Sequence, residues 1–123
     1  MIEIEAVLDD DGVLRTCNAS GHAGAGRTGS DIVCAAVSVL MRTALSVLSG
    51  RKGISISGGA PERGRLWLEA GYEAEGRDFL FAAGVFLIEG LMSVAQEYPD
   101  NCKLNIRTFT EDLNGTETRR KRR

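Results

Sequence analysis

The chain has 123 residues, with 15 Lys or Arg and 17 Asp or Glu, so its formal net charge is −2. This length suits one domain that can bury its own core without disulfides or metals, and the hydrophobic (43%) and charged (26%) fractions are ordinary for a globular protein. Five basic residues are gathered at 119–123, so residues 1–118 carry a net charge of about −7, which argues against a broad nucleic-acid-binding face.

The first half of the chain predicts a hairpin, a loop and a helix. Apolar and acidic residues alternate over 2–8, the period of a half-buried strand, and 13–19 is expected to be the returning strand. A glycine-rich loop follows at 21–29. Residues 30–49 repeat apolar side chains every three and four positions, which predicts a helix that ends at Gly50.

The second half predicts the same order of elements. A short strand at 54–57 and an alternating strand at 65–70 flank a turn at 58–64, which is rich in glycine. A second helix is expected at 77–98, and a final strand at 103–109. The second helix is apolar around most of its circumference, so part of its surface is expected to contact a second subunit.

The predicted order, β-β-α-β-β-α-β, describes an α+β fold with two helices packed on a mixed or antiparallel sheet. We assign residues 1–114 to one domain and residues 115–123 to a basic, disordered tail. An alternative for the tail is contact with phosphate backbones, because such contacts rest on charge alone.

The three cysteines do not indicate a disulfide framework or a zinc site, because their number is odd and their spacing irregular. Cys17 and Cys102 are expected to be structural, and a Cys17–His22–Cys34 site would lack a fourth ligand, so no metal is expected. The N-terminus does not resemble a signal peptide, and the longest apolar run, 79–88, is too short to span a bilayer. We therefore expect a cytoplasmic protein without membrane contact.

The single histidine, His22, precedes Cys34 by twelve positions, and Cys34 is expected in the first turn of the 30–49 helix. A helix N-terminus favours a thiolate and offers N–H donors for an oxyanion, and a nearby imidazole can act as the base. Cys34 and His22 are therefore candidates for a nucleophile and its general base. A packed, unreactive Cys34 is the alternative, and spacing alone favours it because cysteine is so often buried.

Two polar residues flank Cys34 on the expected helix. Ser30 or Asp31 suits the helix cap, and a carboxylate at position 31 would oppose ionisation of the thiol unless it oriented His22. Ser38 lies four residues after Cys34 on the same helix face and can form hydrogen bonds nearby.

The loop itself supports a competing interpretation. Residues 24–29 match G-x-G-x-x-G between a predicted strand and a helix, a pattern typical of dinucleotide binding. The preceding strand does not open a βαβ unit, and no acidic residue ends the next strand. A nucleotide- or phosphate-binding module remains one alternative, and a non-catalytic protein that associates with ribosomes through its basic tail is another.

The two segments around the loop carry a resemblance. Gly21-His22-Ala23 and the later run Gly29-x-Asp31-x-Val33-Cys34-Ala35-Ala36-Val37-Ser38 are similar to the signature of the ribosomal-processing cysteine protease Prp family. The likeness extends over the chain length and the order of elements, and leaves out the tail after about residue 114. It makes the catalytic interpretation of Cys34 the favoured one.

The resemblance implies a cytoplasmic, homodimeric cysteine endopeptidase that needs no cofactor. Members of this family remove an N-terminal extension from the twenty-seventh protein of the large ribosomal subunit. Cys34 matches the family nucleophile and His22 its general base, while Gly21, Asp31 and Ser38 match motif positions with supporting or substrate-binding roles. The family also implies that the 21–29 loop moves when substrate binds.

Overall fold

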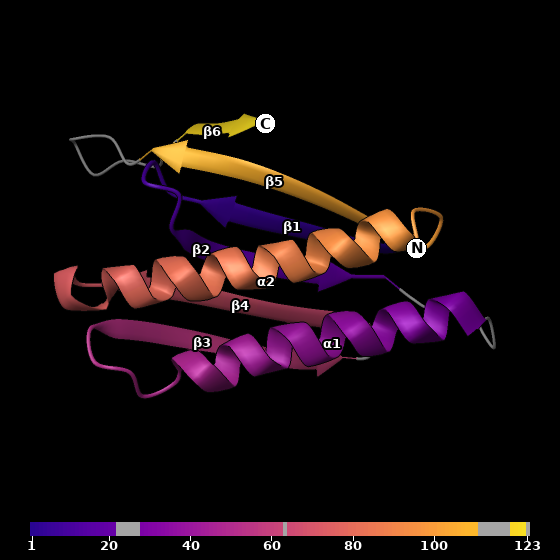
Figure 1. The fold of residues 1–123 in the computed structure, drawn as a ribbon, viewed down its shortest axis with the longest axis horizontal. Coiled ribbons are helices and arrows are strands. Elements are labelled where there is room, and N and C mark those ends of the chain that lie inside the picture. Colours follow the sequence, from indigo (N-terminus) through magenta and orange to yellow (C-terminus); the bar gives the residue numbers. More distant parts are fainter. Residues whose placement is uncertain (22–27, 63, 111–118, 123) are drawn as a thin grey trace.

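The computed structural model describes residues 1–21, 28–62, 64–110 and 119–122, which form one sheet with two long helices on one of its faces (Figure 1). The helices run antiparallel to each other. The strand order in the sheet is β3-β4-β2-β1-β5-β6. The elements are β1 Ile2–Leu8, β2 Leu14–Ser20, α1 Thr28–Leu48, β3 Ile54–Glu62, β4 Arg65–Tyr72, η1 Ala74–Gly76, α2 Arg77–Glu97, β5 Cys102–Thr110 and β6 Arg119–Arg122.

The sheet is mixed because one of its strand pairs is parallel. β1 pairs with β5 in parallel from Ile2↔Cys102 to Leu8↔Thr108, whereas the other neighbouring pairs are antiparallel. The crossover helix α2 makes this pairing possible, because it returns the chain to the end of the sheet where β1 begins. There the amide of Ile2 donates to the carbonyl of Asn101 at 2.8 Å. The predicted α+β class and the order β-β-α-β-β-α-β are confirmed.

The core lies between the sheet and the helix layer. On β1, Ile2, Ile4 and Ala6 are buried and alternate with the glutamates, as the period of a strand covered on one face requires. The buried side chains of α1 are spaced by three and four residues and form the stripe that meets the sheet. They are Val33, Val37, Met41, Ala44 and Leu48.

Glycines on α2 allow the second helix to lie close to its neighbours. A Cβ at Gly84 would come 2.9 Å from the Cβ of Leu14 on β2, and one at Gly90 would come 2.8 Å from Cδ2 of Leu40 on α1. Because real Cβ atoms do not approach so closely, these two positions let α2 pack on both the sheet and α1.

Asp9 holds the turn between β1 and β2. Its Oδ1 accepts hydrogen bonds from the amides of Asp11 (2.9 Å) and Val13 (3.0 Å), the side-chain-to-backbone pattern of an Asx turn. Its Oδ2 accepts a hydrogen bond of 2.5 Å from the hydroxyl of Tyr72, at the end of β4. The hairpin is thereby tied to a strand more than sixty residues away.

Several boundaries differ from those predicted, and the end of β3 differs most. α1 begins at Thr28, two residues earlier than expected, and β3 runs to Glu62 through the segment expected to be a turn. Position 58 of this strand requires glycine, because a Cβ there would lie 2.7 Å from the carbonyl oxygen of Trp67 on β4. Pro61 is tolerated because β3 is an edge strand, where one amide needs no ladder partner.

Part of the basic segment assigned to a disordered tail is paired in the sheet. Arg119–Arg122 form β6, which pairs antiparallel with β5 from Arg107↔Arg122 to Thr110↔Arg119. Without β6, β5 would be an edge strand with unpaired backbone groups, which offers a physical reason for the pairing.

The second helix is longer and more apolar than the 79–88 run suggested. Residues Ala74–Glu97 span 24 residues and contain an 18-residue window with a mean hydropathy of 1.7, which is long and apolar enough by length and composition to cross a membrane. In the fold, however, α2 buries Leu80, Leu87 and Leu91. We therefore describe it as a partly buried core helix that is not a clear membrane span.

Candidate active site

Cys34 is the seventh residue of α1 and lies between the core stripe and the solvent. Its neighbours Val33 and Val37 are buried, whereas Cys34 itself is half-buried and packs against the edge of the core. The sequence predicted Cys34 in the first turn of the helix. Because α1 starts at Thr28, Cys34 lies instead in the second turn. The free N–H groups of the helix start are thus one turn away, and the macrodipole favours a thiolate less at this distance.

The three thiols differ sharply in their surroundings. Cys17 is 0% exposed and Cys102 is 2% exposed, and both lie in the core between the sheet and the helices. Burial raises the pKa of the Cys17 thiol to about 12 and also raises the pKa of Cys102. These two cysteines are structural, as predicted, and Cys34 is the half-buried thiol among the three.

Gly21 directly follows the last residue of β2 and precedes His22. Its φ is +127°, and a Cβ there would lie 2.1 Å from the carbonyl oxygen of Met1, so the position excludes other side chains. Its amide donates to the carbonyl of Gly64 at 3.0 Å. The motif glycine therefore sets the direction in which the loop starts.

Three of the sequence-based predictions lie outside the described residues. His22 and the loop segment 22–27 are among these, so the position of the His22 imidazole relative to Cys34 stays a prediction. The backbone of Asp31 belongs to α1, but its side chain is likewise outside the description. Among the described residues, no group of three or more His, Cys, Asp or Glu side chains is placed to hold a metal ion.

Ser38 has a partner that the sequence analysis missed. Arg42 donates from Nε to the Oγ of Ser38 at 3.1 Å, and Ser38 lies one turn after Cys34. Cys34, Ser38 and Arg42 therefore follow one another at intervals of four residues along one flank of α1. The four-residue spacing of Ser38 and Arg42 could have predicted this hydrogen bond, since residues four apart on a helix are neighbours.

Comparison with known proteins identifies the class of enzyme and the family to which this chain belongs. Residues 1–103 match a family model described as "Cysteine protease Prp". The α+β domain is thus that of a cysteine protease. The chain is a member of the Prp family. No curated protein matches it.

Solved structures share the fold at low sequence identity. The chain is similar to SMU.848 from Streptococcus mutans (TM-score 0.73, 24% identity), covering 88% of this chain and 95% of that one. It is also similar to the ribosomal processing protease Prp of S. aureus in complex with a substrate peptide (TM-score 0.72, 21% identity; 86% and 99% covered). The same protease with a covalently linked product peptide gives a TM-score of 0.71 at 22% identity, with 86% and 99% covered.

Proposed function

We propose that this cytoplasmic cysteine protease removes the N-terminal extension of the twenty-seventh protein of the large ribosomal subunit. The observation that carries the proposal is the half-buried Cys34 on α1, within a chain that belongs to the Prp family over residues 1–103. The S. aureus family member of similar fold is a ribosomal processing protease and binds a substrate peptide, which supports an equivalent role here.

In the proposed mechanism, Cys34 and His22 act as nucleophile and general base. His22 accepts the proton of the Cys34 thiol, and the thiolate sulfur bonds to the carbonyl carbon of the scissile peptide bond. N–H groups near the start of α1 stabilise the resulting oxyanion. The imidazolium then donates its proton to the leaving amine as the C–N bond breaks. Water hydrolyses the thioester, which releases the acyl product and restores the thiol.

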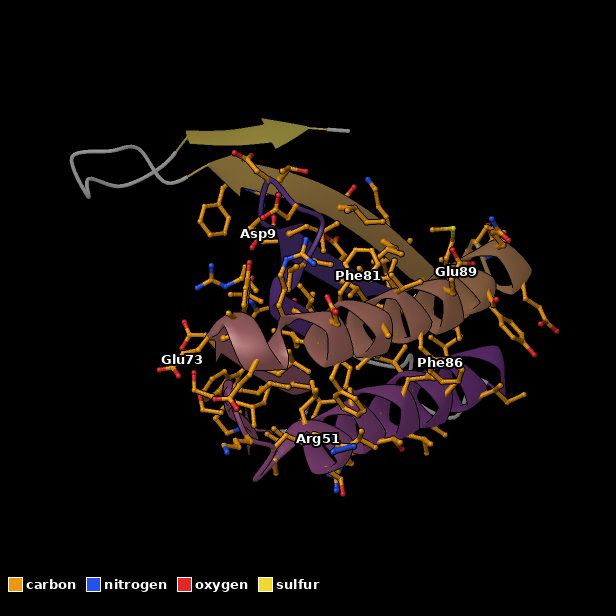
Figure 2. All side chains as sticks on the ribbon, turned by 60° about the vertical axis from the view of Figure 1, so that its left-hand side comes forward. Asp9, Arg51, Glu73, Phe81, Phe86 and Glu89 are labelled. Atoms are coloured by element: carbon orange, nitrogen blue, oxygen red, sulfur yellow. The ribbon has the colours of Figure 1, made fainter. Side chains whose placement is uncertain are left out.

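The partner predictions for this function concern a second copy of the chain and the ribosome. Large apolar side chains remain exposed on the helix layer, led by Phe86 (75%) and Val39 (62%). Phe86 lies where α2 faces α1 (Figure 2). The exposure of these apolar side chains supports the proposed homodimer, in which a second subunit would cover them, and sedimentation velocity tests this. We also propose that residues 119–123 contact the ribosome. Co-sedimentation with ribosomes that weakens with added salt, and that is lost when these residues are deleted, tests this contact.

Cleavage of an extended ribosomal protein tests the central proposal. The purified chain is mixed with the extended protein from the same genome, and the mass of the product is followed. We expect Cys34→Ala to abolish cleavage, and Thr43→Ala, an exposed change on the same helix, to leave it intact. Undiminished cleavage by Cys34→Ala would overturn the assignment of the nucleophile.

The accessibility of the thiols gives an independent check. In the folded protein, iodoacetamide should label Cys34 well before Cys17 and Cys102, because the latter two are buried. Labelling of all three at one rate, that of global unfolding, would show that Cys34 is an inert core residue.

A further inference from the structure

A cavity of about 180 Å³ lies between α1 and the ends of β3 and β4 that meet in their hairpin. Among the described residues, Arg42 is the one charged residue in its lining, and the other lining residues are apolar or glycine. The lining consists of Met41, Arg42, Leu45, Gly59, Ala60, Leu66 and Trp67. Apolar cavities of about 150 Å³ are large enough to bind benzene, so this space can hold one apolar side chain.

The cavity lies on the same flank of α1 as the candidate nucleophile. Ser38, Arg42 and Leu45 follow Cys34 at intervals of three and four residues, which is the spacing of one helix face. At a rise of about 1.5 Å per residue, Arg42 is about 12 Å along the helix from Cys34. An extended peptide advances about 3.3 Å per residue, so three or four residues of substrate cover this distance.

The wall that β3 contributes is made of small residues. Gly58 lies next to Leu45, whose Cδ1 would be 3.2 Å from a Cβ at that position, and Gly59 and Ala60 follow it along the strand. The exposed Ala60 adds only a methyl group. A larger residue at position 60 would therefore take up space that is now open at the end of the hairpin.

Arg42 occupies the side of the cavity that faces Cys34. Its Nε donates to Ser38 Oγ at 3.1 Å, so the guanidinium is held toward the N-terminal end of α1. Arg42 also lines the cavity. A peptide main chain that crosses from Cys34 to the cavity passes the guanidinium, which can donate to its carbonyl oxygens.

We propose that this cavity is a specificity pocket for one apolar side chain of the substrate, of leucine to phenylalanine size, three or four residues from the bond that Cys34 attacks. The inference rests on the proposed protease function. The apolar lining selects the chemistry of the occupant, and the shared face of α1 sets its distance from the scissile bond.

Trp67 is the single tryptophan of the chain and borders the cavity. Its indole lies beside Gly59, on the face of the sheet opposite to Leu45, so its emission reports indirectly on a peptide that binds at the β3–β4 hairpin. The Cys34→Ala protein is titrated with synthetic, tryptophan-free peptides that span the junction of the extended ribosomal protein. Each peptide carries Leu, Phe or Asp at the third or fourth residue on either side of the scissile bond. We expect Leu or Phe at one such position to change the Trp67 emission, and Asp there to weaken binding about tenfold or more.

Cleavage kinetics with a matched pair of variants complete the test. Ala60→Leu should lower kcat/KM about tenfold, mainly through KM, whereas Ser57→Leu, an exposed change on the same strand outside the lining, should not. A glycine at the critical substrate position should remove the difference between wild type and Ala60→Leu, because no side chain is left to clash.

The outcomes separate the two proposals. No cleavage of any peptide by wild type would overturn the protease function, while the difference in affinity between the Leu or Phe peptides and the Asp peptides would still decide whether the cavity takes an apolar side chain. Cleavage with an unresponsive Trp67 and equal kinetics for Ala60→Leu and Ser57→Leu would overturn the pocket and leave the protease function intact.

Discussion

Arg42 donates a hydrogen bond of 3.1 Å from its Nε to the Oγ of Ser38, a motif residue one helical turn after Cys34. Because Arg42 also lines the cavity at the β3–β4 hairpin, this bond connects the face of α1 that carries the candidate nucleophile Cys34 with the proposed pocket. We therefore propose that Ser38 acts as a positioning residue through Arg42.

Removal of the Ser38 hydroxyl should weaken substrate binding more than turnover. In Ser38→Ala the guanidinium of Arg42 loses its anchor, and we expect KM to rise about three- to tenfold with kcat nearly unchanged. Steady-state kinetics measure this split. Ser49→Ala, which removes a serine hydrogen bond to Leu45 at the end of the same helix, serves as the control. A fall in kcat at constant KM would instead indicate contact with the reacting atoms.

An alanine at Gly21 should impair catalysis as well as stability. Its Cβ would meet the carbonyl oxygen of Met1, so the chain that leads to His22 must shift. We expect a loss of about 1–3 kcal/mol in the free energy of unfolding and a fall of tenfold or more in kcat/KM. Gly50→Ala is the comparison, since Gly50 also has a positive φ, +75°, but an open environment. Equal kinetic losses in both variants would argue against a specific role for Gly21.

Two glycines of α2 should respond differently to alanine. Gly84→Ala brings a Cβ against the Cβ of Leu14, which cannot move without β2, and should cost about 1–3 kcal/mol in urea unfolding. Gly90→Ala meets only the mobile end of the Leu40 side chain, and the gain in helix propensity offsets this contact. Similar losses in both variants would show that α2 does not pack on β2 as described.

The bond between Tyr72 and Asp9 should contribute to stability without affecting the site. Tyr72→Phe removes the 2.5 Å hydrogen bond to a carboxylate, and we expect a loss of about 1 kcal/mol in the free energy of unfolding. Urea denaturation measures the loss, and kcat/KM should stay unchanged. A measurable kinetic defect would contradict the purely structural role of this pair.

Alkaline pH should destabilise the fold through Cys17. Burial raises the pKa of this thiol from 9.0 to about 12, so between these values the unfolded chain loses a proton that the native state keeps. Stability is therefore full below pH 9 and falls by up to about 1.4 kcal/mol per pH unit above it. In Cys17→Ala the decline, followed by urea unfolding from pH 8 to 11, should be shallower. An identical slope in both proteins would refute the assignment.

The sequence predicted most of the fold because each element carries a local signal. Alternation marked β1 and β5, and apolar spacing marked both helices within a few residues of their observed bounds. The extent of β3 was missed because its glycines and Pro61 resemble a turn, and only the close approach of β4 and Leu45 shows why they stand in a strand. The pairing of β6 depends on a vacant edge of β5, which no local pattern reveals.

By itself the sequence determined the α+β class, the family motif and the choice of Cys34 as candidate nucleophile, because these depend on residue types and short spacings. The tertiary structure decided that Cys17 and Cys102 are buried and Cys34 is half-buried, and that Ser38 holds Arg42 beside a cavity. The two thiols are buried where the sheet meets the helices, and the cavity lies where α1 meets β3 and β4. These segments are distant in the chain, so only their packing could show either feature.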